Sequence, residues 1–215
     1  MTVIMGATFV GGAAIAGDSL LHNPDTMATV RNSSKTTVIG NRVAVAQAGQ
    51  FTGTERVMDE LEKLNPSAVT PQAVVDCIVS HAGQIHADRT KTGRSLETFY
   101  LVGGVEEDGN SVIVSIAIHQ NEVKRFSGPG QMIAIGTQLL TQQRAFDAFN
   151  SSVRPGSNIV ELDTWVRRVV ADESTASPQT VGFPATLLVM RRENAIEAHL
   201  ETTGEHDGRL AGFIP

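Results

Sequence analysis

The sequence predicts a single α+β domain in which two antiparallel β-sheets lie between two layers of helices. Three observations support this class. Along the 215 residues, apolar segments follow the order strands, two helices, strands, two helices, strands. The strand segments are short and are separated by turns rich in glycine and asparagine, which is typical of hairpins. Each helical segment carries one apolar stripe, and two sheets between two helical layers would bury all of these stripes.

Two hairpins are predicted at the beginning of the chain. The first turns at Val10-Gly11-Gly12 and the second at Gly40-Asn41. Glycine and asparagine accept the positive φ angles that tight hairpin turns require. The four strand segments of these hairpins are residues 2–8, 13–18, 35–39 and 42–49.

Two helices are predicted after Gly49, where the apolar period changes. Asn65-Pro66 ends the first helix, and Thr70-Pro71 opens the second as N-cap and first-turn proline. The apolar stripes of the two helices are Val57, Met58, Leu61 and Leu64, and then Val74, Val75, Ile78, Ala82 and Ile85.

Strands resume in the middle of the chain. Asp108-Gly109-Asn110 and Gln120-Asn121 are turn sequences between apolar segments. The predicted strands are residues 98–105, 111–119, 122–126 and 132–135.

Two further helices and two strands are predicted in the last part of the chain. Ser157 or Asn158 is the expected N-cap of the fourth helix. The final strands are residues 185–190 and 195–200, and residues 201–215 form a C-terminal tail of the single 1–215 domain. The stripes of the two helices are Leu139, Leu140, Ala145, Phe146 and Phe149, and then Leu162, Trp165, Val166, Val169 and Val170.

The composition excludes several classes of function. The net charge is −6 and no basic cluster occurs, which argues against a nucleic-acid surface. No apolar run is long enough to cross a membrane, and the apolar N-terminal segment lacks the basic region of a signal peptide. The one cysteine, Cys77, cannot form an internal disulfide, so a reducing compartment is expected, and we expect a cytoplasmic protein.

Four residues with useful chemistry fall at the open ends of the two N-terminal hairpins. Thr2 and Asp18 end the first hairpin, and Lys35 and Gly49 end the second. If the hairpins lie side by side, a hydroxyl, a carboxylate, an ammonium and a backbone N–H converge, as nucleophilic catalysis requires. The alternative is an edge-strand threonine, a surface ion pair and an ordinary turn glycine.

The spacing of these residues resembles that of a known family. Thr2 is followed after fifteen residues by Asp18, then by Lys35 with Ile-Gly four residues later, and then by Val-Ala-x-Ala-Gly ending at Gly49. This pattern is similar to the N-terminal half of proteasome β-subunits and of their smaller bacterial relatives, the peptidase subunits that pair with a separate unfolding ATPase. The resemblance is strong over residues 2–49 and traceable to about Met190.

The resemblance implies an N-terminal-nucleophile hydrolase with a four-layer αββα sandwich. Such a protein cleaves peptides or unfolded proteins with a threonine nucleophile, needs no cofactor, assembles into rings and has an unfolding ATPase as a possible partner. Thr2 would be the nucleophile, and its own α-amine, with a pKa near ~7.7–8.0, would be the base once Met1 is removed. Lys35 with Asp18 would tune that amine, and the Gly49 N–H would hold the oxyanion.

Further site residues follow from the resemblance in the rest of the chain. The family has a serine at the start of its third helix, where this chain has Thr137. It also has Asp-x-x-Ser after the fourth helix, which corresponds here to Asp172 and Thr175. His22, in the long connection between the hairpins, and Gln47, two residues before the glycine, are expected to contact substrate.

Three alternatives remain open. A chain that keeps Met1 would be a catalytically silent ring scaffold of the same fold. A small-amide acylase is possible within the superfamily. Gly17-Asp18-Ser19-Leu20 also spells the signature of a serine esterase family with Ser19 as nucleophile, but the other blocks of that family do not occur. No metal site is predicted, because the histidines form no cluster with ligand spacing.

Overall fold

A computed structural model describes residues 2–22, 29–30, 35–49, 54–91, 97–136, 138–154, 159–192 and 194–200. Within these residues there are two five-stranded antiparallel sheets, one two-stranded pair and four α-helices. The α+β class is therefore confirmed. The predicted tail, residues 201–215, and the predicted helix caps Ser157 and Asn158 lie outside the described residues.

The two large sheets are built mainly from hairpins, and the chain leaves and re-enters each sheet. In spatial order, the first sheet consists of β10 (Met132–Ile135), β1 (Ile4–Phe9), β2 (Gly12–Asp18), β11 (Ala185–Arg191) and β12 (Ala195–Leu200). The second consists of β5 (Thr36–Ile39), β6 (Val43–Gly49), β7 (Thr98–Val105), β8 (Ser111–Ala117) and β9 (Glu122–Ser127). The small pair consists of β3 (Leu21–His22) and β4 (Thr29–Val30).

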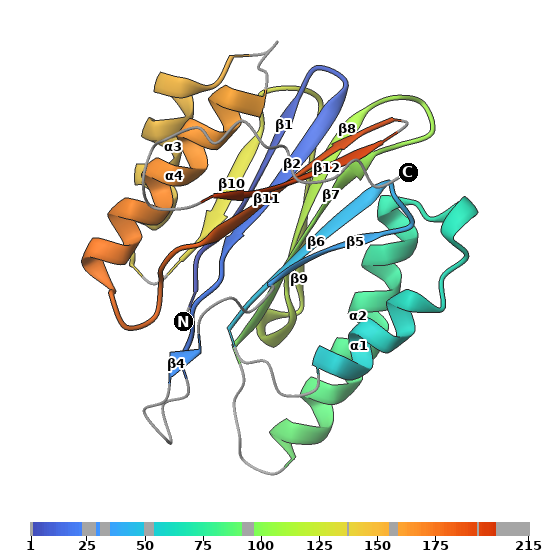
Figure 1. Cartoon of the computed structure of the whole chain (residues 1–215). Helices are drawn as coiled ribbons and strands as arrows, with labels where there is room; N and C mark the ends of the chain where they lie inside the picture. Colours follow the sequence, from blue (N-terminus) through green and yellow to red (C-terminus); the bar gives the residue numbers. More distant parts are fainter. Residues whose placement is uncertain are drawn as a thin grey trace.

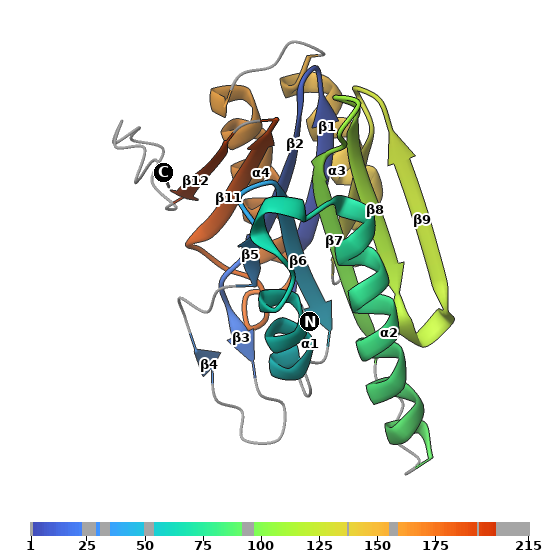
Figure 2. The ribbon, with the colours of Figure 1, turned by 90° about the vertical axis from the view of Figure 1, so that its right-hand side faces the viewer.

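The helices fall into two pairs that lie beside different sheets (Figure 1). The first pair is α1 (Thr54–Glu62) and α2 (Pro71–Thr90), with the short 3₁₀ helix η1 (Pro66–Ala68) between them. The second pair is α3 (Thr141–Ser152) and α4 (Ile159–Ala176). Figure 2 shows α1 and α2 from the side on which they cover the β5–β9 sheet.

Turn and cap residues act at the ends of these elements as predicted. Gly40 and Asn41 have φ angles of +57° and +61°, and they belong to the three-residue connection, residues 40–42, between the paired residues Ile39 and Val43 of β5 and β6. The Thr70 side chain accepts a hydrogen bond from Ala73 N at 3.1 Å, and Pro71 is the first residue of α2. These local signals set where the strands and helices start.

Buried apolar residues form three clusters. One joins the first sheet to α3 and α4, and includes Trp165, whose Nε1 donates to Ala145 O at 3.0 Å. A second joins the β5–β9 sheet to α1 and α2, with Tyr100 and Leu61 among its members. The third contains residues of both sheets, for example Ile15 on β2 and Leu101 on β7. Each helix pair is therefore packed on its own sheet, and the two sheets share a core.

Two details of the predicted elements are wrong. The strand predicted over residues 111–119 ends at Ala117, and Ile118–Gln120 form the 3₁₀ helix η2. Leu139, Leu140 and Phe146 were expected on the buried stripe of the third helix, but their exposed fractions are 103%, 59% and 46%. Leu139 and Leu140 precede α3, which begins at Thr141, and the buried residues of this helix are Thr141, Ala145, Ala148 and Phe149.

None of the helices in the described part of the chain is both long and apolar enough to span a membrane.

The close approach of the two sheets at Ile15 leads to a first prediction. A Cβ atom at Gly103 on β7 would lie 2.6 Å from Ile15 Cγ1, whereas a Cβ atom at Gly83 on α2 would meet nothing within 4 Å. Gly103→Ala should therefore lower the free energy of unfolding by about 1–3 kcal/mol, since overpacking strains the core. Gly83→Ala should raise it by about 1 kcal/mol through helix propensity. Urea denaturation measures both, and a Gly103→Ala variant as stable as the wild type would contradict the packing described.

Candidate active site

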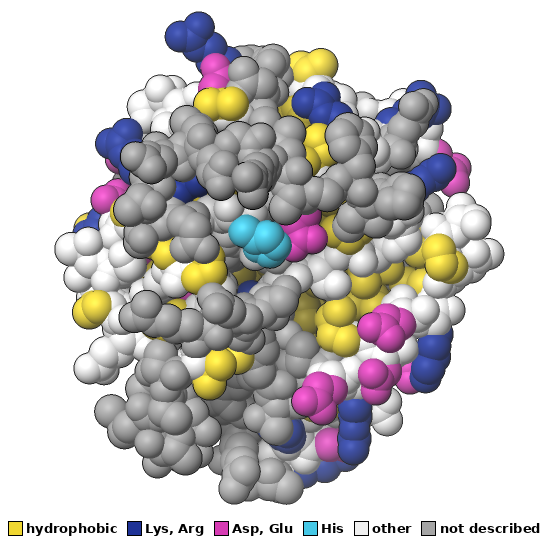
Figure 3. Space-filling model, viewed as in Figure 1, with side chains coloured by type: hydrophobic (Ala, Val, Ile, Leu, Met, Phe, Trp, Pro, Cys, Tyr) yellow, Lys and Arg dark blue, Asp and Glu magenta, His cyan; other side chains and the backbone are white. Residues whose placement is uncertain are grey.

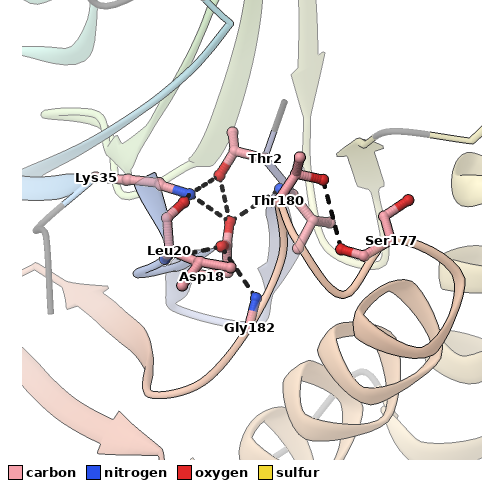
Figure 4. A network of polar contacts seen from close by, with 8 residues as sticks. Thr2, Asp18, Leu20, Lys35, Ser177, Thr180 and Gly182 are labelled. Atoms are coloured by element: carbon pink, nitrogen blue, oxygen red, sulfur yellow. Dashed lines mark hydrogen bonds and ion pairs between the residues drawn. The ribbon is translucent and has the colours of Figure 1, made fainter. Parts of the chain in front are cut away.

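Thr2, Asp18 and Lys35 meet where an end of one large sheet lies against an end of the other (Figure 4). Thr2 lies just before β1 and Asp18 is the last residue of β2, and Asp18 N donates to Val3 O at 3.2 Å. Lys35 lies just before β5 of the second sheet, and its carbonyl accepts from Gln47 N at 3.0 Å. The hairpin of the first sheet thus positions Thr2 and Asp18, and the hairpin of the second sheet positions Lys35.

The Thr2 hydroxyl lies between a carboxylate and an ammonium. Its Oγ1 donates to Asp18 Oδ1 and accepts from Lys35 Nζ. Lys35 Nζ also donates to Asp18 Oδ1 at 2.8 Å and to Leu20 O at 2.5 Å. All three protons of the ammonium are therefore directed at acceptors, and one of these acceptors is the hydroxyl oxygen.

The Asp18 carboxylate accepts five hydrogen bonds. Besides Thr2 Oγ1 and Lys35 Nζ, Oδ1 accepts from Val3 N at 3.0 Å. Oδ2 accepts from Leu20 N at 3.0 Å and from Gly182 N at 3.3 Å. Five donors therefore converge on this one carboxylate and fix its orientation.

The cluster is buried. Thr2, Asp18 and Lys35 are exposed to 4%, 1% and 5%, and the two charged side chains have no exposed surface. Burial lowers the pKa of the Lys35 ammonium below its ordinary value of 10.5, and the charge and hydrogen bond of Asp18 oppose this shift. A buried ion pair of this kind contributes little net stability, because desolvation offsets the attraction. Its presence here calls for another reason.

The arrangement favours loss of the proton from Thr2 Oγ1. An ammonium that donates to a hydroxyl oxygen stabilises the negative charge that develops when the hydroxyl attacks a carbonyl carbon. Asp18 keeps that ammonium charged and oriented. The residues present can therefore prepare an oxygen nucleophile.

Gly49 and Gln47 lie on β6, the strand that neighbours Lys35. Gly49 ends β6 with a φ angle of +92°, and a Cβ atom there would lie 2.0 Å from Glu97 O, so only glycine fits. Gln47 is buried, and strand alternation places it on the same face as Val45, which packs toward α1 and α2. The hydrogen bond between Gln47 N and Lys35 O ties this strand to the cluster.

Asp172 and Thr175 do not follow the fourth helix, as was expected, but lie within it. The helix α4 continues to Ala176, and both side chains are exposed. The Thr175 hydroxyl donates to Ala171 O of the same helix at 2.9 Å. The expectation placed the helix end too early, because the proline that stops the helix is Pro178.

The loop that follows α4 reaches the cluster instead. Gly182 N donates to Asp18 Oδ2 at 3.3 Å, and Ser19 N donates to Pro184 O at 3.1 Å. Figure 4 shows Ser177 and Thr180 on this loop, a hydroxyl pair with the spacing expected for Asp172 and Thr175. The sequence contains one signal for this shift, the Ser177-Pro178 step, but no pattern that marks the Gly182 amide.

The remaining predicted site residues are placed only in part. Thr137 lies outside the described residues, as does the side chain of His22, whose backbone belongs to β3. Ser19, the alternative nucleophile, is buried, and its Oγ has no hydrogen-bond partner among the described residues. A serine without a base in reach is a poor nucleophile.

The described surface also carries a charged groove, away from the Thr2 cluster. A groove of about 250 Å³ between α1 and α2 is lined by side chains of both signs, including Arg56, Glu60 and Lys63. Figure 3 shows acidic and basic side chains interspersed over these helices. Among the described residues, no group of three histidine, cysteine, aspartate or glutamate side chains could hold a metal ion.

No protein-family model matches the chain, and no curated protein matches its sequence. The likeness to proteasome β-subunits therefore depends on the residue pattern over residues 2–49. The chemistry that can be argued for the chain depends on the Thr2, Asp18 and Lys35 geometry.

The lowered pKa of Lys35 leads to a second prediction. At pH values between the folded-state pKa of Lys35 and its ordinary pKa of 10.5, the unfolded chain carries a proton on Lys35 that the folded chain has lost. The free energy of unfolding therefore rises with pH in this range. Lys35→Met removes this contribution. Urea denaturation at a series of alkaline pH values should show wild-type stability rising relative to that of the variant.

The matched control is Lys91→Met, at a side chain that is 75% exposed. Its stability should follow the wild type across the same pH range. Parallel curves for wild type and Lys35→Met would show that burial does not shift the Lys35 pKa.

Proposed function

We propose that the protein is a threonine endopeptidase of the proteasome β type, which hydrolyses peptide bonds through an acyl-enzyme on Thr2. The observation that carries this proposal is the buried cluster in which the Thr2 hydroxyl accepts a hydrogen bond from Lys35 and donates one to Asp18. A buried ammonium and carboxylate centred on one hydroxyl add little to stability and suit an activated nucleophile.

The proposed reaction requires that Met1 is removed, which a small second residue such as threonine permits. The free α-amine of Thr2 then takes the proton as Oγ1 attacks the carbonyl carbon, and the Gly49 N–H stabilises the oxyanion. The amine passes the proton to the leaving peptide nitrogen as the C–N bond breaks. Water then hydrolyses the ester and restores the hydroxyl.

The proposal extends to architecture and surroundings. We propose the four-layer αββα sandwich, which the clusters joining each helix pair to its sheet and the two sheets to each other support. Peptides or unfolded proteins are the proposed substrates, with His22 and Gln47 in contact with them. A ring of subunits, an unfolding ATPase partner and a cytoplasmic location complete the proposal.

Mutation of the cluster gives the third prediction. Thr2→Ala should abolish peptide hydrolysis and leave the fold intact, because Asp18 and Lys35 keep their other partners and the two lost hydrogen bonds cost about 1 kcal/mol each. Lys35→Ala should also inactivate the protein. Ser19→Ala should keep most of the activity, since its hydroxyl contacts no partner among the described residues. Hydrolysis of a fluorogenic peptide library measures all three.

Intact-mass measurement of the same preparations gives the required control. Active protein should lack Met1, because an acylated nitrogen is no base. An assembled protein that keeps Met1 and cleaves nothing would be the silent scaffold. Loss of activity in Ser19→Ala, with Thr2→Ala active, would identify the serine esterase instead.

Self-assembly is the fourth prediction, and exposed apolar side chains at α3 support it. Leu139, directly before the helix, and Phe146, within it, are exposed to 103% and 46%. Light scattering in dilute, low-salt buffer should give a particle many times the chain mass of 22.9 kDa. Leu139→Ser with Phe146→Ser should reduce the particle mass, whereas Val123→Ser, on β9, should not. A wild-type protein that is active as a monomer would exclude a ring.

A further inference from the structure

A carboxylate that the proposed reaction does not use is buried at the end of α4. Glu173 is 1% exposed and continues the apolar stripe of that helix, which includes Leu162, Val166 and Val169. Burying a carboxylate among apolar residues is costly unless the charge is hydrogen-bonded. Two groups of α3 meet it: Thr141 Oγ1 donates to Glu173 Oε1 at 2.8 Å, and Arg144 Nη1 forms an ion pair with the same oxygen at 4.0 Å.

The same hydroxyl holds the residues that precede α3. Gln138 N donates to Thr141 Oγ1 at 3.2 Å, and Thr141 N donates to Gln138 O at 3.1 Å. Gly136 is packed onto this pair, because a Cβ atom there would lie 2.4 Å from Thr141 Cγ2 and 3.0 Å from Glu173 Oε2. Gln138 is therefore fixed relative to the buried carboxylate.

Gln138 in turn contacts the loop that reaches Asp18. Its Nε2 donates to Ser177 Oγ at 2.9 Å. The loop is folded onto the Ser177 carbonyl, which accepts from Thr180 N and Val181 N at 3.0 Å each. The next residue is Gly182, whose N–H donates to Asp18 Oδ2. Figure 4 shows Ser177, Thr180 and Gly182 along this loop beside the Thr2 cluster.

We propose that Glu173 is a positioning residue for Asp18, acting through Thr141, Gln138 and Ser177 to hold the Gly182 amide on the Asp18 carboxylate. Asp18 orients Lys35, so a looser loop disturbs the geometry at Thr2 although the loop is not hydrogen-bonded to Thr2 among the described residues. We call the series of contacts from Glu173 through Thr141, Gln138 and Ser177 to Gly182 the relay. The effect on rate rests on the proposed function. The effect on the Gly182 amide does not, which allows the two proposals to fail separately.

Hydrogen exchange of the Gly182 amide tests the structural part. Thr141→Val keeps the side-chain shape and removes the hydroxyl, so exchange at Gly182 should accelerate about tenfold, while amides of β1 and β7 keep their protection. Thr141→Ser restores the hydroxyl and should restore slow exchange. Thr164→Val is the matched control, because the Thr164 hydroxyl contacts only Val160 O among the described residues.

Peptide hydrolysis tests the functional part. Thr141→Val should lower kcat on the order of tenfold to a hundredfold with little change in KM, because the loop acts on the nucleophile and not on substrate binding. Thr141→Ser should recover kcat. Should Thr141→Val fail to fold, Gln138→Ala tests the relay instead, because the exposed Gln138 side chain contacts Ser177. This variant must show the same faster Gly182 exchange and the same lower kcat. Ser174→Ala is its control.

Unchanged Gly182 exchange in a folded Thr141→Val or Gln138→Ala variant overturns the relay. Accelerated exchange with unchanged kcat overturns the claim that the relay serves catalysis. A wild type that shows the predicted exchange pattern but has no Thr2-dependent hydrolysis would refute the proposed function and leave the relay in place.

Discussion

The hydrogen bonds received by the Asp18 carboxylate are the interaction on which the site depends. Its two oxygens collect donors from Thr2 and Val3, from Lys35, and from the backbone of Leu20 and Gly182. These donors come from the two residues before β1, the residue before β5, the connection after β2 and the loop after α4. One buried anion therefore links both sheets and this loop, and a shift in any of them reaches the Thr2 hydroxyl.

The packing between the two sheets sets the distance between Lys35 and Asp18. The shared cluster uses small side chains such as Ala13 and Ala46 beside Ile15, and glycines on β1 and β7 face the same isoleucine. Small residues let the sheets approach closely, so that Lys35, on the second sheet, reaches Asp18, on the first. The core thereby acts as the scaffold that brings an ammonium to a hydroxyl.

The sequence predicts the fold class and the hairpin part of the site because both follow from local signals. Gly40-Asn41 specifies a turn, and a turn places Lys35 and Gly49 at the same end of a hairpin. The contribution of the last third of the chain was not predictable in this way. The Gly182 amide is marked by no side chain, and Glu173 looks like a surface residue until its burial is known. The ends of α3 and α4 were misjudged because residues near helix ends can belong to either the helix or the loop.

The most direct test of the central claim is covalent labelling of the active protein. A peptide carrying a reactive β-lactone acylates the oxygen that attacks it, and tandem mass spectrometry locates the adduct. The proposed chemistry predicts one acyl group on the hydroxyl of Thr2, in a chain that begins at Thr2, and no label in Lys35→Ala. An adduct on Ser19, or peptide hydrolysis that continues with Thr2 unlabelled and Met1 in place, would contradict it.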